Sequence, residues 1–265
     1  MNILKAIQFV SDQGNVVEQA RLRRILENER PSLEVIAELF AGQRVDGGFP
    51  PFWAQDYSSL DATCFRLAKA EQLGILETEE AVRRAVRFIA ERQSPDGSWE
   101  EDARMAGLAP PWATPSDLAA KLYLTANCGL WLALLEDSEM KASKAAAFLQ
   151  THLNTDGHLP GFINTHWLAC GLWHKLGWRA PASGAFEYLS REINQLAASE
   201  LAWLINTLCA AGVTPDQLLV QDAAARLDEK QHEDGHWPSA DGPEYDVHTT
   251  LEALRALWFC GLRPE

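Results

Sequence analysis

Gln93-Ser94-Pro95-Asp96-Gly97-Ser98-Trp99 is the stretch that decides the fold, because three other segments repeat its pattern. They are Gln43–Phe49, Leu153–Leu159 and Gln231–Trp237, and the four together give the template Q-x-x-D-G-x-aromatic. Their aspartates are separated by 50, 60 and 78 residues, and the last spacing is long enough to hide a degenerate unit near Asn194-Gln195. Asp-Gly is a strong turn signal, since glycine supplies the positive φ and aspartate bonds its own backbone.

Helical periodicity surrounds these turns, with an amphipathic segment before each one and a more apolar segment after it. Residues 78–93 are an example of the amphipathic kind. Residues 122–135, which carry no charge, are an example of the apolar kind. Outer-type helices are expected at 2–12, 32–43, 78–93, 139–152, 183–194 and 215–231. Inner-type helices are expected at 15–28, 58–73, 117–135, 163–176, 198–211 and 246–260.

Six helical hairpins without a strand pattern predict an all-α fold. One hairpin cannot bury both faces of its apolar helix, whereas stacked neighbours can. An open solenoid would need a polar terminal cap, which the sequence does not offer. The most economical closure is an α6–α6 toroid (barrel), an inner ring of helices inside an outer ring with a central cavity. We therefore expect a single toroid domain over residues 1–265.

Composition narrows the function further. The 265 residues carry 23 Lys and Arg against 37 Asp and Glu, a net charge of −14, which argues against nucleic acid as a partner. The five cysteines are irregularly spaced, which favours free thiols in a reducing compartment. We see no signal peptide and no apolar run of about 18 residues, so we expect a cytoplasmic protein without a transmembrane segment. The ten tryptophans need a specific explanation.

The Q-x-x-D-G-x-W repeats, with Ser59-Leu-Asp61-Ala-Thr63 and Asp246-Val-His248-Thr249-Thr250, resemble the squalene cyclase and protein prenyltransferase β-subunit superfamily. The resemblance covers the chain from about residue 30 to its end. It implies an α6–α6 toroid whose central cavity holds isoprenoid chains. The implied partner is an apolar small molecule, with a prenyl diphosphate as one candidate, and the oligomeric state stays open.

Polar residues recur at one level of the apolar helices. Asp61, Asn164, Ser199 and His248 each stand thirteen residues before a glycine that follows a helix, and Tyr123 occupies a similar level. Buried polar groups need partners or face a cavity, so these residues are expected to ring the cavity mouth. The alternative is that Asp61, Asn164 and Ser199 are N-caps, which leaves His248 the best single candidate.

Two groups of aromatic residues are expected. Trp99 and Trp237 belong to the repeat and are predicted to brace neighbouring hairpins. Trp53, Trp112 and Trp167 lie beside the starts of inner helices and are predicted to line the cavity, where aromatic faces stabilise cations by about 0.5–2 kcal/mol each.

The resemblance implies a catalytic acid, since squalene cyclase-like enzymes protonate an alkene with the middle aspartate of D-x-D-D. This chain has neither that motif nor D-D-x-x-D, and Asp61 stands alone in its segment. Asp61 and His248 are therefore the catalytic candidates. The reaction requires a carboxylic acid that neighbours keep protonated and activate.

Metal sites are the remaining candidates. Prenyltransferase-like proteins bind zinc, and the resemblance places His248 and Cys170 at two ligand positions. His166, one turn before Cys170, substitutes for an absent aspartate in a Cys-His-His set suited to zinc. Glu100-Glu101-Asp102 is a candidate for Mg²⁺, with a solvated loop as the alternative. His232 and His236 beside Asp234 are expected to be solvated.

Three functions follow. The first is a terpenoid cyclase-like enzyme acting on an isoprenoid or similar extended apolar substrate in an aromatic-lined cavity. The second is a non-catalytic toroid that binds an apolar ligand. The third is a zinc-dependent, prenyltransferase-like enzyme.

Overall fold

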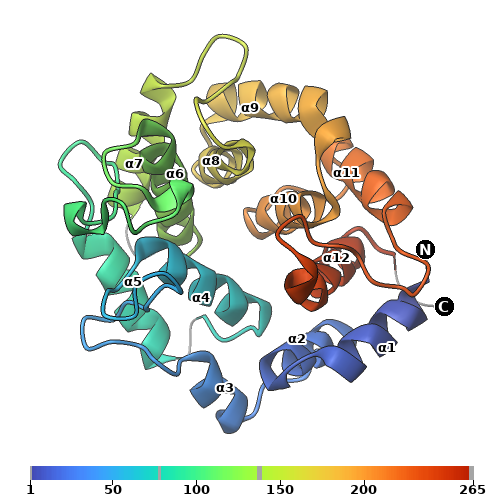
Figure 1. Cartoon of the computed structure of the whole chain (residues 1–265). Helices are drawn as coiled ribbons and strands as arrows, with labels where there is room; N and C mark the ends of the chain where they lie inside the picture. The colour runs from blue at the N-terminus through green and yellow to red at the C-terminus, as the bar shows by residue number, and fades with distance from the viewer. Residues whose placement is uncertain (1, 77–78, 136–138, 263–265) are drawn as a thin grey trace. The chain divides into compact units, whose positions relative to one another are not determined.

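The computed structural model describes residues 2–76, 79–135 and 139–262 (Figure 1). Within them the chain is helical, with one isolated bridge between Phe49 and Ser59. The α-helices are α1 (Ile3–Gln13), α2 (Val16–Glu27), α3 (Leu33–Leu39), α4 (Leu60–Gln72), α5 (Glu80–Glu91), α6 (Leu118–Leu134), α7 (Glu139–Thr151), α8 (Ile163–Lys175), α9 (Arg179–Glu192), α10 (Ala198–Ala210), α11 (Leu218–Glu229) and α12 (Asp246–Phe259).

The all-α prediction is confirmed, and each predicted helix has a counterpart among these twelve. Two of the predicted helix bounds differ from the observed ones by about one helical turn. The helix expected at 32–43 ends at Leu39, before Gly42 turns the chain with φ 82°. The helix expected from 183 begins at Arg179, because Pro181 falls in its first turn, where a missing N–H costs nothing. Thr78, the predicted start of another helix, lies outside the described residues.

The chain forms two compact units, which are described separately. Unit 1 comprises Met1–Glu38 and Leu189–Glu265, and unit 2 comprises Leu39–Tyr188. In unit 2, α6 contacts α4, α7 and α8, and in unit 1, α12 contacts α1, α2 and α10 (Figure 1). The single toroid domain and its six-hairpin closure stay predictions.

The repeat turns are built by their aspartate and glutamine. Each aspartate accepts the backbone N–H two residues later, as Asp96 does from Ser98 at 3.0 Å. Gln93 donates to the Gly97 carbonyl within the turn at 3.0 Å and to Lys141 of α7 at 2.8 Å. The glutamines of the first and fourth repeats make the same pair of bonds, to Ala81 of α5 and to Asn2 before α1. In these three repeats the glutamine therefore fixes the turn against the next outer helix, whereas the third repeat has Leu153 at this position.

Glycine in these turns allows close backbone approach. Gly97 has φ 92°, and a Cβ there would collide with the carbonyl of Lys144 in α7. Gly235 packs in the same way on Lys5, so the fourth repeat turn lies directly against α1. Within unit 1, the C-terminal part of the chain is thus joined to its first helix.

The tryptophans of the second and fourth repeats each connect three elements. Trp99 is fully buried, and its indole N–H donates to the Ile89 carbonyl of α5 at 2.8 Å. Its backbone N–H donates to Thr125 of α6 at 3.0 Å. Trp237 repeats this arrangement with Leu227 and Thr250. The bracing role predicted for Trp99 and Trp237 is confirmed.

The apolar character of the inner-type helices reflects burial inside a protein. In α6, thirteen residues between Ala120 and Ala133 are buried. Even so, no helix among the described residues combines the length and the apolar character that crossing a bilayer requires.

Thr125→Val tests the bond that anchors the second repeat. Valine keeps the shape of threonine but leaves the buried Trp99 N–H without an acceptor, so we expect a loss of about 1–3 kcal/mol in the free energy of unfolding. Urea denaturation measures it. The control is Thr214→Val at an exposed position, which should stay within about 0.5 kcal/mol of the parent. Equal losses in the two variants would contradict the anchoring role.

Candidate functional site

Asp61 occupies the first turn of α4 in unit 2, but it does not cap the helix. The N-cap is Ser59, whose hydroxyl accepts the Ala62 N–H. The Asp61 carboxylate instead accepts the Tyr123 hydroxyl at 2.7 Å and the indole N–H of Trp112 at 3.1 Å. The structure thus brings together three residues that the sequence singled out separately.

The same register holds in two other helices. Asn164 and Ser199, like Asp61, are the second residues of their helices, whose N-cap positions are Phe162 and Ala197. The N-cap interpretation is therefore wrong for all three residues. The Ser199 hydroxyl accepts the Ala240 N–H at 3.3 Å. The Asn164 side-chain oxygen is buried without a hydrogen-bond partner, which makes it a candidate contact for a ligand.

Tyr123 begins a row of polar and aromatic groups along one face of α6. Asn127 donates to the Tyr123 hydroxyl at 3.3 Å, and Trp131 donates to the Asn127 side-chain oxygen at 3.1 Å. Residues four apart share a helix face, so the row runs along the α6 axis. The Phe162 ring meets Tyr123 edge-on at 6.4 Å. This row holds the Tyr123 hydroxyl in position to donate to Asp61.

Glu101 satisfies the start of α4. It is 2% exposed, accepts the Ser59 hydroxyl at 2.6 Å and the Leu60 N–H at 2.9 Å, and also accepts the Tyr57 hydroxyl. Burial raises the pKa of its carboxyl. Glu100 pairs with Lys121 and Asp102 with Arg104. The Mg²⁺ site and the solvated loop considered for this acidic run are therefore both wrong for Glu101.

The environment of Asp61 suits an acid. Its side chain is half-buried, and burial raises the pKa of the carboxyl above its usual value. Tyr123 and Trp112, by donating hydrogen bonds, lower the pKa in part. Both donors are neutral, so they stabilise a carboxylate without fixing it in an ion pair.

Trp53 and Trp167 differ from Trp112. Trp53 is half-buried, with its ring centroid 6.0 Å from that of Tyr57. Trp167, in α8, is fully buried and presents no accessible surface to a ligand. This burial does not support the predicted place of Trp167 in a cavity wall.

His248 belongs to a buried network in unit 1. Arg21 donates to His248 Nδ1 at 3.1 Å and to Glu252 at 2.5 Å, and Asn206 donates to the other Glu252 oxygen at 2.7 Å. Burial lowers the pKa of Arg21. The Nδ1 lone pair accepts from Arg21 and is not available to take a proton from a ligand. Its Nε2 lies 3.8 Å from Glu252 Oε1 and the side chain is 28% exposed, so the catalytic role of His248 stays a prediction.

His166 is occupied by the backbone. Its Nε2 accepts the Leu159 N–H at 2.9 Å, while Nδ1 lies 3.2 Å from the carbonyls of Phe162 and Ile163. Burial lowers its pKa to about 4. The Cys170 thiol donates to the Ala182 carbonyl, and burial raises its pKa. The zinc set of His166, Cys170 and His248 spans both units and stays a prediction, but neither His166 nitrogen is free for a metal.

The sequence reasoning did not single out Arg21 and Glu252, and it singled out Glu101 without its partners at the start of α4. Asn127 and Asn206 carried a usable signal, because an amide within an apolar helix requires a partner. Arg21 carried the same signal inside the helix expected at 15–28. The partners of Arg21 and Glu101 lie 231 and 42 residues away, which no local pattern identifies.

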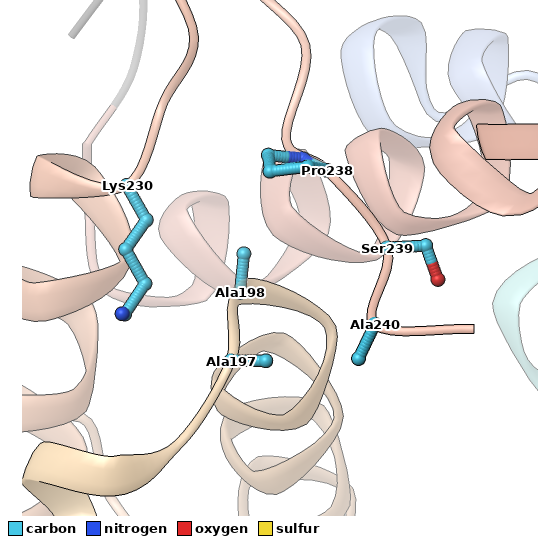
Figure 2. Close-up of a pocket in the computed structure, with 6 residues that line it drawn as sticks. All are labelled: Ala197, Ala198, Lys230, Pro238, Ser239 and Ala240. Atoms are coloured by element: carbon cyan, nitrogen blue, oxygen red, sulfur yellow. The ribbon is translucent and has the colours of Figure 1, made fainter. Parts of the chain in front are cut away.

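A shallow pocket lies in unit 1, at the start of α10. Figure 2 shows its lining, and its volume is about 320 Å³. The lining residues are Ala197, Ala198, Lys230, Pro238, Ser239 and Ala240. They include one ammonium group and one hydroxyl but no carboxylic acid, so the pocket lacks the acid found at Asp61.

The chain resembles known proteins in its fold and not in its sequence. No family model and no curated protein sequence matches it. Solved structures do: a protein from Actinoplanes superposes with a TM-score of 0.66 at 16% identity, covering 98% of each chain. A variant of the type II terpene cyclase MstE from Scytonema, in complex with the product merosterolic acid A, gives 0.62 at 15% identity, covering 98% of this chain and 96% of that one. Another MstE variant, in complex with the substrate geranylgeranyl dihydroxybenzoate, gives 0.62 at 14%, covering 97% and 96%.

These likenesses extend over nearly the whole chain at low identity. They show that the chain has a terpene cyclase-like fold, in agreement with the α/α class expected from the repeats.

Asp61→Asn tests the raised pKa of the carboxyl through stability. A group whose pKa is higher in the folded than in the unfolded chain stabilises the protein below its unfolded pKa, about 3.9 for aspartate, and loses that contribution as the pH rises through the folded pKa. The variant should therefore gain stability relative to the parent as the pH rises. Urea unfolding across a pH series measures this, with Asp102→Asn as an exposed control that should show no such gain. A pH-independent difference would contradict the raised pKa.

Proposed function

We propose that the chain is a cyclase that acts on an isoprenoid or similar extended apolar substrate, and that Asp61 starts the reaction by protonating a carbon–carbon double bond. The observation that carries this proposal is the half-buried Asp61 carboxyl, with its raised pKa and two neutral donors. The terpene cyclase-like fold supports it, since MstE is a type II terpene cyclase whose substrate carries a geranylgeranyl chain.

Burial and hydrogen bonding act on Asp61 at different stages of proton transfer. Burial keeps part of the carboxyl population protonated at a pH where a free aspartic acid is ionised. After transfer, the hydrogen bonds from Tyr123 and Trp112 stabilise the carboxylate that remains. In this proposal Tyr123 and Trp112 are the neighbours that activate the acid, in a chain that lacks the D-x-D-D motif.

The reaction balances without an added reagent. The double bond gives its π electrons to the Asp61 proton, one new C–H bond forms, and the adjacent carbon becomes a carbocation. A second double bond attacks that carbon to close a ring, and loss of a proton to a base ends the sequence. The product is an isomer of the substrate, and Asp61 regains a proton from solvent.

In this proposal the cation forms beside aromatic rings. Trp112 and Tyr123 touch the carboxyl, and Phe162 meets the Tyr123 ring. A cation over the face of such a ring is stabilised by about 0.5–2 kcal/mol, and the upper end of this range or more applies when the cation is desolvated. The Asn164 oxygen, at the start of the same helix as Phe162, is a candidate contact for a polar end of the substrate.

Turnover is the first measurement. The protein is incubated with geranylgeranyl and farnesyl compounds that carry either a neutral head or a diphosphate, and products are identified by mass spectrometry and NMR. We expect a cyclised isomer, and Asp61→Asn should reduce its formation by about 10²–10⁴-fold, the range of general acid catalysis. Asp102→Asn, which changes an exposed carboxylate paired with Arg104, should leave the rate unchanged.

Full activity of Asp61→Asn would contradict the assignment. Retention of a prenyl compound without turnover would favour the non-catalytic binding protein, and turnover that requires stoichiometric zinc would favour the prenyltransferase-like enzyme.

The pH profile gives an independent test through Tyr123. Because the protonated carboxyl is the active form, the rate should fall as the pH rises through the pKa of Asp61. The Tyr123 hydrogen bond lowers that pKa, so Tyr123→Phe should move the loss of activity to higher pH while lowering the maximal rate. Steady-state rates over a pH series measure the shift. Substrate affinity, measured with Asp61→Asn as the background, controls for a loss of binding. An unshifted profile would contradict the direct bond.

A further inference from the structure

The fourth repeat turn holds a cluster that the proposed function does not use. His232, Asp234 and His236 each offer one ligand atom, and these atoms lie within 4.8 Å of one another. The other repeat turns carry arginine, serine or asparagine at the position of His232, so only this one has histidine on both sides of its aspartate. We propose that these three residues bind a zinc ion or a similar divalent transition metal.

The spacing of the ligand atoms fits a tetrahedral ion. Zinc bonds of about 2.0–2.2 Å place neighbouring ligand atoms roughly 3.3 Å apart. His232 Nδ1 lies 3.2 Å from Asp234 Oδ1, which already matches that separation. His236 Nδ1 lies 2.5 Å from the same oxygen, as a hydrogen bond, and moves outward by less than 1 Å when a metal replaces the shared proton. Water completes the coordination.

The turn holds these side chains in place before any metal binds. The His232 N–H donates to the His236 carbonyl at 2.8 Å, and the Gly235 N–H donates back to the His232 carbonyl at 2.9 Å. The His236 N–H donates to Asp234 Oδ1 at 3.3 Å. Because the backbone of the turn is fixed, binding orders only side-chain rotations.

A second carboxylate lies near the other nitrogen of His236. Its Nε2 lies 3.5 Å from Asp246 Oδ2, and the other Asp246 oxygen accepts the Ser239 N–H at 2.7 Å. Metal-binding histidines generally donate their other ring N–H to a carboxylate, which sets the tautomer. Phe9 of α1 stacks on the imidazole at 5.0 Å, and the His236 side chain is only 14% exposed. The expectation that His236 is solvated is therefore wrong.

The elements that meet at this site indicate a structural role. Phe9 and Lys5 belong to α1, and the Lys5 ammonium donates to the Glu233 carbonyl inside the turn. Asp246 begins α12. A metal at this turn would fasten the first and last helices of unit 1 to the same repeat. This role is independent of Asp61, which belongs to unit 2.

Zinc titration of chelator-stripped protein tests the proposal. Isothermal calorimetry should show one equivalent bound, with a rise in the melting temperature under excess metal. His232→Ala should abolish this binding, and its side chain is 61% exposed, so the variant is expected to fold. Asp246→Asn should weaken binding about 10–100-fold, as loss of an orienting partner does. His174→Ala, at an exposed position outside the cluster, should bind like the parent.

Nitrogen NMR of the imidazoles then identifies the ligand atoms. Zinc should shift the Nδ1 signals of His232 and His236 and leave the Nε2–H of His236 protonated. The proposal is overturned if His232→Ala retains the full affinity, or if the parent binds no zinc at concentrations that saturate ordinary two-histidine sites. Because none of these readouts involves turnover, their failure would leave the assignment of Asp61 unaffected.

Discussion

One buried backbone N–H in each repeat determines how the hairpins fit together. The residue that ends the Asp-Gly turn has its N–H inside the protein, where an unpaired donor costs about 1–3 kcal/mol. The acceptor comes from the following inner helix. It is a threonine hydroxyl in the first, second and fourth repeats (Thr63, Thr125 and Thr250), and the His166 ring in the third repeat. The bond therefore fixes where that helix starts relative to the turn. The glutamine of the repeat fixes the next outer helix, so a seven-residue motif positions two helices.

The third repeat shows how one structural need can imitate a functional motif. There the acceptor is an imidazole, and the proton on Nδ1 faces the carbonyls of Phe162 and Ile163. Burial keeps the ring neutral, with a pKa of about 4, although the bonds to these two carbonyls raise the pKa in part. Read from sequence, His166 four residues before Cys170 is a plausible ligand pair. The turn explains the histidine without a metal, whereas His232 and His236, which the sequence suggested were solvated, are the residues whose ring nitrogens face a common carboxylate oxygen.

Periodic features were predictable from sequence, and long-range partners were not. The twelve helices and the bracing tryptophans follow from patterns of fewer than twenty residues. The shared level of Asp61, Asn164 and Ser199 was also predictable, because the distance to the following glycine counts turns of one helix. Of the two causes considered, the N-cap is excluded, since each residue lies two positions beyond it, and the place at a cavity mouth stays a prediction. The contacts of Arg21 with Glu252 and of Glu101 with Ser59 depend on which segments pack together in the fold. The sequence around each side chain does not identify its partner.

Glu101 also explains why Asp61 is available for chemistry. An aspartate in the first turn of a helix is normally drawn to the unpaired N–H groups there. Glu101 accepts the Leu60 N–H and approaches that of Asp61 at 3.4 Å, so the start of α4 is satisfied by a residue from another segment. The Asp61 carboxyl is then free to turn toward Tyr123 and Trp112. Burial raises the pKa of the Glu101 carboxyl, and the charge of Asp61 adds to that rise. Glu101 is thus held by the start of α4, which leaves Asp61 as the carboxyl of the two whose partners are the side chains of Tyr123 and Trp112.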